Sequence, residues 1–274
     1  MNKSLLKSLV VASAFAASAG AQAAVNLGGV LVDPGMHLEV ASLYENPVFA
    51  VGQTLSGFGE VTSINGSAGF CAAGLGTCEL TYRFGGYTVI NPLTPTSVSF
   101  TGGWVNFYVG TGANNDFNPF TSGSSAADIA AATNGTLWLT LVGHDNGGFT
   151  LKGNGLNIGT GNDIGFGGGL LDVDLTGLLN GNAAGAGAVA NPNFDTNSQS
   201  DLLAGFADFQ FTSSFGTGVA PHPGECAVGV LTSCLPGSAT LRGVANVVPE
   251  PASLALIGAG LLVGGLVSRR RKQK

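Results

Sequence analysis

Short apolar stretches that alternate with polar residues, separated by Gly, Asn, Pro and Ser, run through most of this chain. Leucines occupy every second position of residues 137–142, and residues 104–109 and 207–212 have the same period of two, which places alternate side chains on opposite faces of a strand. Further strands are predicted at 37–43, 47–51, 58–64, 78–84, 86–90, 97–101 and 240–248. With one short helix predicted at 126–132, the pattern indicates an all-β fold, an antiparallel β-sandwich or jelly roll.

Glycine accounts for 45 of the 274 residues, and it is densest between Gly143 and Asn197 together with Asn and Asp. These residue types favour turns because they tolerate left-handed backbone conformations or hydrogen-bond their own backbone. We therefore expect the strands to be joined by long Gly/Asn-rich loops.

The first 23 residues have the three-part order of a secretory signal. Lys3 and Lys7 are followed by an apolar run from Leu9 to Ala19, which is too short to span a bilayer, and then by Ala21-Gln22-Ala23. We predict a signal peptide over 1–23, with Ala21 and Ala23 as the small residues at its cleavage site, and a secreted β-rich body over 24–247.

The C-terminal segment combines a motif, an apolar run and a basic cluster. Pro249-Glu250-Pro251 precedes uncharged residues from Ala252 to Ser268, a length at the short end for a transmembrane helix. The basic tail consists of Arg269, Arg270, Arg271 and Lys272. Under the positive-inside rule this tail stays cytoplasmic and the body lies outside.

Residues 248–274 resemble the PEP-CTERM sorting tag of Gram-negative bacteria. The resemblance implies that exosortase, a membrane-embedded cysteine enzyme, recognises Pro249, Glu250 and Pro251 and cuts near them. It also implies a transient inner-membrane anchor, followed by release to the outer surface or the extracellular space. The tag says nothing of what the body binds.

Charge is divided unevenly between the ends and the body. Only three of the ten basic residues lie in the body, which holds all sixteen acidic residues when Glu250 at its edge is counted and then has a net charge of −13. Such a body repels nucleic-acid phosphates, so nucleic-acid binding is excluded. Cations, polysaccharides and other proteins remain as partners.

The four cysteines form two local pairs, Cys71 with Cys78 and Cys226 with Cys234. In an exported chain they should be oxidised, and although three connectivities exist, we favour the two local disulfides. A Cys₄ metal site lacks its usual CxxC spacing.

No nucleophile elbow, P-loop or zinc-protease motif occurs in the sequence. His144 is the one histidine beside an acid, Asp145, but neighbours in a strand point to opposite faces. We therefore expect no enzymatic activity and no cofactor other than calcium. Asp163, Asp172 and Asp174 lie in or just after a glycine-rich stretch that could offer oxygen ligands to Ca²⁺, whereas the simpler interpretation of this stretch is a set of turns.

The leading hypothesis is a non-enzymatic surface or matrix protein with a structural or adhesive role, linked to exopolysaccharide, biofilm or floc formation. That link comes from the PEP-CTERM resemblance alone. The alternative is a calcium-assisted carbohydrate-binding module, and the third is a secreted hydrolase. A sugar-stacking face for the alternative could come from Tyr82, Tyr87, Trp104, Tyr108 and Trp138.

Overall fold

The computed structural model describes residues 24–33, 35–74, 76–176, 187–201, 205–216, 219–225 and 235–246. Residues Asn26–Asn246 form one compact unit. The strands are β1 (Val25–Leu27), β2 (Val30–Val32), β3 (Gly35–Glu45), β4 (Thr54–Ile64), β5 (Cys78–Val89), β6 (Ser97–Thr111), β7 (Thr136–Gly143), β8 (Leu151–Leu156), β9 (Ile164–Val173), β10 (Gln199–Asp201), β11 (Gly205–Ala207), β12 (Phe209–Phe215) and β13 (Leu235–Val244). The helices are η1 (Gly112–Asn114), α2 (Ser125–Ala132), α3 (Asn191–Phe194) and η3 (Pro223–Glu225).

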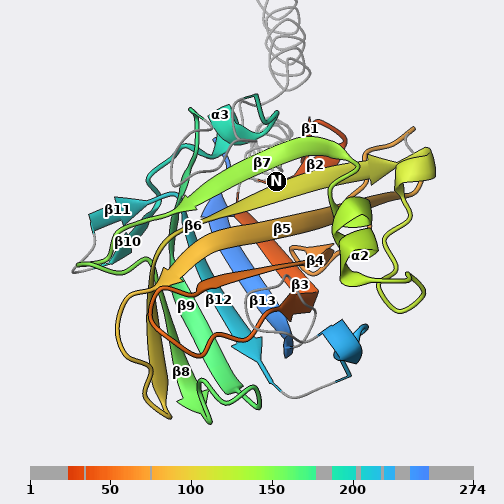
Figure 1. The fold of residues 1–274 in the computed structure, drawn as a ribbon. Helices are drawn as coiled ribbons and strands as arrows, with labels where there is room; N and C mark the ends of the chain where they lie inside the picture. The colour runs from red at the N-terminus through yellow and green to blue at the C-terminus, as the bar shows by residue number, and fades with distance from the viewer. Residues whose placement is uncertain are drawn as a thin grey trace, which may run out of the picture. The chain divides into compact units, whose positions relative to one another are not determined.

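The strands of the main sheet close into an antiparallel barrel (Figure 1). Eight strands follow one another around it in the order β12, β13, β3, β4, β5, β6, β7 and β9. The barrel closes because β12 pairs with β13 on one edge and with β9 on the other, from Phe209 opposite Leu171 to Phe215 opposite Gly165. The predicted sandwich or jelly roll is therefore wrong, although the antiparallel all-β class is confirmed. Strand periodicity shows which side chains share a face, but it does not show whether distant strands pair.

Strand β6 pairs with two different strands along the two halves of its length. β6 pairs with β8 along Ser97–Phe100 and with β7 along Trp104–Val109. The two halves of β6 meet at Gly102 and Gly103, whose φ angles of 72° and 93° lie in the left-handed region that favours glycine. Residues 97–101 and 104–109, predicted as separate strands, thus form one continuous strand.

Part of the glycine-rich stretch after Gly143 is strand, although the segments 144–150 and 157–163 are loops of the predicted kind. It contains β8 and β9, and β9 alone includes Gly165, Gly167, Gly168 and Gly169. These residues pair with β8 on one side and with β12 on the other. Glycine is accepted here because neighbouring segments of the backbone approach closely: a Cβ on Gly165 would overlap the carbonyl oxygen of Asn154, and a Cβ on Gly169 that of Thr150.

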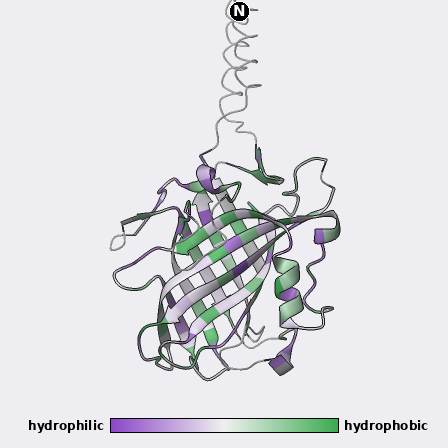
Figure 2. Ribbon diagram, turned by 45° about the horizontal axis from the view of Figure 1, so that its top comes forward, coloured by the Kyte–Doolittle hydropathy of each residue, from purple (hydrophilic) through white to green (hydrophobic). Residues whose placement is uncertain are grey.

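Outside the barrel, a cluster of aromatic and apolar side chains lies under α2. Tyr44 and Phe58 pack with Ala132 of α2, and Phe117 and Ile129 adjoin them. The helix predicted at 126–132 is confirmed as Ser125–Ala132, with the Ser124 hydroxyl accepting a hydrogen bond from the Ala127 N–H at its N-terminus. Figure 2 shows hydrophobic and hydrophilic residues interspersed along the strands of the body.

Further elements cover β7. Phe194 of α3 contacts the ring of Trp138 on β7 and the ring of Phe209 on β12. The Trp138 indole N–H donates a 2.7 Å hydrogen bond to the carbonyl of Leu27, which ties the β1–β2 hairpin to the barrel. The alternation predicted along 137–142 is real, but both of its faces are buried because these elements cover the outer one.

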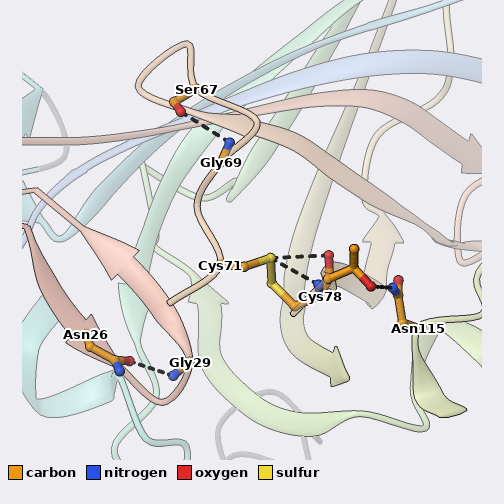
Figure 3. Close-up of a disulfide and its surroundings, with 8 residues drawn as sticks. Asn26, Gly29, Ser67, Gly69, Cys71, Cys78 and Asn115 are labelled. Atoms are coloured by element: carbon orange, nitrogen blue, oxygen red, sulfur yellow. Dashed lines mark hydrogen bonds between the residues drawn. A yellow bond between two sulfur atoms is a disulfide. The ribbon is translucent and has the colours of Figure 1, made fainter. Parts of the chain in front are cut away.

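A disulfide between Cys71 and Cys78 confirms the first predicted pair (Figure 3). Cys71 lies in the connection between β4 and β5, and its backbone forms an isolated antiparallel β-bridge with Val30 of β2. Cys78 begins β5. The bond therefore joins a barrel strand to the loop that pairs with the N-terminal hairpin. Cys226 and Cys234 lie outside the described residues, as do the predicted signal peptide and the predicted transmembrane helix. Within the described ranges, no helix is long and apolar enough to cross a membrane.

Candidate functional site

Two adjoining cavities lie inside the barrel. The larger, of about 80 Å³, has a mostly apolar wall. Its lining residues are Leu43, Glu45, Leu55, Tyr82, Phe84, Tyr87, Val105, Phe107, Leu151, Leu171, Phe211, Ser213, Ala239, Thr240 and Leu241. The smaller cavity, of about 40 Å³, shares Glu45, Leu55, Leu151 and Ser213 with the larger one. We call the two together the lumen site.

The alternation of side chains along the strands explains which residues form the apolar wall of the lumen site. Val105 and Phe107 lie on one face of β6, as predicted from their spacing, and both line the larger cavity. Large rings are accommodated because glycines oppose them: Phe84 lies over Gly57, and Tyr87 lies over Gly103. In the smaller cavity Gly153 and Gly167 have no side chain to fill the space. The lumen site is thus the space that remains because the aromatic rings fill only part of the volume that the glycine residues leave open.

Glu45 is the acidic residue that lines both cavities. It ends β3, two residues after the lining residue Leu43, so the period of two turns its side chain inward. It is only 8% exposed. No hydrogen bond joins its carboxyl to another described residue, but its oxygens are not among the fully buried atoms without a partner, so they keep contact with the cavity space. Burial raises the pKa of Glu45 to about 8, and the charge of Asp163 adds to this effect. A buried carboxyl without a partner costs free energy and calls for an explanation.

The backbone around Glu45 is held firmly by its neighbour, Asn46. The Asn46 side-chain oxygen accepts hydrogen bonds from the Ser56 N–H (2.7 Å) and the Ser56 hydroxyl (3.0 Å). Its amide donates to the carbonyls of Pro47 and Thr54. The Asn46 side chain is thus fully bonded and fixes the turn between β3 and β4, while the adjacent carboxyl is left without such bonds.

Asp163 supplies a second carboxyl to the smaller cavity. It lies at the end of the turn before β9 and is 4% exposed. Its carboxylate accepts a 3.1 Å hydrogen bond from the Thr160 N–H and further bonds from the N–H groups of Gly159 and Gly161. Burial nonetheless raises its pKa. In the part of the chain that the structure describes, no Lys, Arg or His lines either cavity.

The three aspartates predicted to bind calcium are not brought together. Asp163 lies before β9, Asp172 lies near the other end of this strand, and Asp174 follows it. Asp172 pairs with His144, and Asp174 accepts hydrogen bonds from the N–H and hydroxyl of Thr176. Among the described residues no group of three His, Cys, Asp or Glu side chains could hold a metal ion. Calcium binding stays a prediction, to be tested by calorimetric titration.

The histidines form two contacts that sequence adjacency did not reveal. His144 Nδ1 lies 2.7 Å from Asp172 Oδ2 across two paired strands, while its neighbour Asp145 instead accepts a hydrogen bond from the Gly148 N–H. His222 joins a cluster at α2 that we call the α2 cluster; its members are Ser122, Asp128, His222 and Glu225. His37 lies in β3.

The α2 cluster contains Ser, His and Asp, but not in the order of a catalytic triad. His222 Nε2 lies 2.9 Å from Ser122 Oγ and 3.0 Å from Asp128 Oδ2, so both partners share one ring nitrogen. In a triad the acid binds the other nitrogen, so that it orients the ring as a base for the serine. Here Ser122 and Asp128 also hydrogen-bond each other directly. The arrangement fastens the segment before η3 to α2 and gives the hydrolase hypothesis no support.

The predicted sugar-stacking residues are mostly internal. Trp138, Tyr82 and Tyr87 are buried, and both tyrosines line the larger cavity. Trp104 is half-buried, with the guanidinium of Arg83 5.9 Å from its ring centre. These five aromatics therefore do not form one exposed platform, and carbohydrate binding stays a prediction that a glycan array can test.

Glu45 is the residue that sequence reasoning missed. The available signal was the alternation of side chains along a strand. Glu45 lies two positions after the apolar Leu43 and so shares its face, and an acid on an apolar face is unusual. This alternation could place Glu45 inside the barrel. It could not show that Asp163, which is 118 residues away in sequence, lines the same cavity.

The fold and its cavities define a closed antiparallel barrel with a carboxyl-containing lumen. In addition, residues 247–272 match the PEP-CTERM protein-sorting motif. The chain is therefore an exported protein whose C-terminal, membrane-associated sorting signal marks it for exosortase. The matched range includes Pro249, Glu250, Pro251 and the basic tail, which confirms the resemblance; these residues lie outside the described part of the structure. No curated protein and no solved structure matches the chain.

Proposed function

We propose that this exported protein is a non-enzymatic binding protein that holds a small, largely apolar molecule in the lumen site. The observation that carries the proposal is the buried Glu45 carboxyl, which faces two apolar cavities and has no described hydrogen-bond partner. An eight-stranded barrel leaves an interior that side chains nearly fill or that takes one small ligand. A polar group fixed in a mostly apolar wall is the usual composition of a ligand site.

Filling the cavity with a side chain tests this proposal. Ser213 lines both cavities, whereas its neighbour Ser214 faces outward and is exposed. Ser213→Leu should abolish the thermal stabilisation that a panel of small apolar compounds gives the wild-type protein, and Ser214→Leu should preserve it. If no compound in the panel raises the Tm of the wild-type protein, or if Ser213→Leu responds like Ser214→Leu, the lumen is not a binding site.

We also propose that the protein acts outside the cell, at the outer surface or in the extracellular matrix, with a structural or adhesive role linked to exopolysaccharide. The sorting motif at 247–272 supports this location. The acidic body suits a matrix that gathers cations. Changing Pro249-Glu250-Pro251 to three alanines should retain the protein in the membrane fraction and reduce its amount in the matrix. Unchanged processing and distribution would contradict the sorting step.

A further inference from the structure

We infer that the lumen site selects a small organic cation, a short primary amine with an apolar chain, and that Glu45 binds its ammonium group. This inference rests on the proposed lumen-binding function and names the class of ligand. Among the described residues, two carboxyls and no basic group line the two adjoining cavities. An ammonium supplies three hydrogen-bond donors and a positive charge, and no described residue that lines the cavities provides that charge.

The electrostatics of the site favour a cation over an anion or a neutral molecule. The titratable groups that face Glu45 are Asp163, before β9, and Tyr82 and Tyr87, both on β5. Tyr82 is already engaged, because its hydroxyl donates a 2.9 Å hydrogen bond to the Ser42 carbonyl. Asp163 repels a second negative charge at Glu45, and a carboxylate ligand would meet the same repulsion. The net charge of −13 on the body raises the local concentration of cations further.

The dimensions of the site limit the ligand to a few heavy atoms. The cavities measure about 80 and 40 Å³. A cavity of about 150 Å³ binds benzene, so this site suits a chain of about four carbons. Leu55 and Leu151 line both cavities and would contact the methylene groups, each buried methylene contributing to affinity through the hydrophobic effect.

Binding of an ammonium is coupled to a proton. Because burial holds the pKa of Glu45 near 8, its carboxyl is mostly protonated at pH 7 in the free protein. The ammonium favours the carboxylate, so complex formation should release most of one proton at pH 7. A neutral alcohol of the same length gives no such release, which provides a signature that a merely structural role for Glu45 would not produce.

The test compares n-butylamine with n-butanol by calorimetry, using the full-length protein in lipid nanodiscs at pH 7 in two buffers of different ionisation enthalpy. We expect butylamine to bind at least tenfold more tightly than butanol, with release of most of one proton. In Glu45→Gln, whose side chain has nearly the same shape, we expect the amine to lose at least tenfold in affinity and the proton release to vanish, while butanol binds as before.

The outcomes separate this inference from the function on which it rests. If butanol binds as tightly as butylamine, the cation preference is overturned and lumen binding stands. If neither compound binds, both are overturned. The comparison of the two ligands on the wild-type protein does not depend on any variant, so it decides the point even if Glu45→Gln fails to fold. If Glu45→Gln folds and keeps the full amine affinity, Glu45 is not the binding group.

Discussion

The side chain of Tyr82 on β5 lies over Gly59 on β4, so that a Cβ added to Gly59 would lie 2.5 Å from the Tyr82 hydroxyl oxygen. The same Cβ would overlap the carbonyl oxygen of Ser42, to which Tyr82 donates its hydrogen bond. A ring on one strand thus occupies the volume that the missing side chain on the next strand leaves. Phe84 over Gly57 repeats the arrangement two residues further along.

Gly59→Ala should therefore destabilise the barrel by about 2–3 kcal/mol, because both neighbours of the new methyl group are held in place. Gly123→Ala is the matched control, since its Cβ would have no atom within 4 Å and should change stability by less than about 0.5 kcal/mol. Denaturant unfolding measures both. Equal stability of the two variants would mean that the ring and the glycine are not in register as described.

The stability of the protein should depend on pH through Glu45. The folded pKa of about 8 lies above the ordinary value of 4.5, so the stability associated with the protonated carboxyl is fully present below pH 4.5 and is lost as pH rises through 8. Between pH 5 and pH 8 the free energy of unfolding should fall more in the wild-type protein than in Glu45→Gln, by on the order of 3 kcal/mol. Asp145→Asn, at an exposed carboxylate, is the control and should follow the wild-type curve.

The disulfide should stabilise the fold by restricting the unfolded chain. Cys71 and Cys78 are separated by seven positions, and a loop of this size corresponds to about 2–3 kcal/mol in the chain-entropy treatment. The double variant Cys71→Ser, Cys78→Ser should lose this amount in denaturant unfolding. Hydrogen exchange should also become faster in the β1–β2 hairpin, which pairs with the loop at Cys71. Unchanged exchange in that hairpin would show that the bond stabilises β5 alone.

The α2 cluster should contribute to stability rather than to catalysis. His222→Ala removes the ion-pair partner of Asp128, whose carboxyl is buried and whose pKa burial already raises. Loss of the partner should cost about 1–3 kcal/mol and accelerate amide exchange in α2. Thr121→Ala, at the exposed neighbour of Ser122 in the cluster, is the control. Loss of a hydrolytic activity in His222→Ala without a change in unfolding would contradict a structural role.

Local patterns in the sequence predicted local features of the structure. The period of two along 104–109 correctly grouped Val105 with Phe107, and the Ser124 cap correctly placed α2. The cysteine spacing indicated the Cys71–Cys78 bond. In each case the residues involved are within a few positions of one another, so their contacts follow from the geometry of a strand, a helix end or a short loop.

The barrel and its site depend on contacts between distant parts of the chain. Closure requires β9 to pair with β12, which brings Gly165–Leu171 against Phe209–Phe215. Some of the glycines in the stretch expected to form loops, such as Gly165 and Gly169, are strand residues instead. Their missing side chains make room for neighbouring segments, which the sequence alone does not reveal. By itself, the sequence determined the sorting motif at 247–272 and the inward faces of several strands. Only the tertiary structure decided that those faces enclose a lumen and that Glu45 meets Asp163 there, because register and closure are set by pairing across the whole chain.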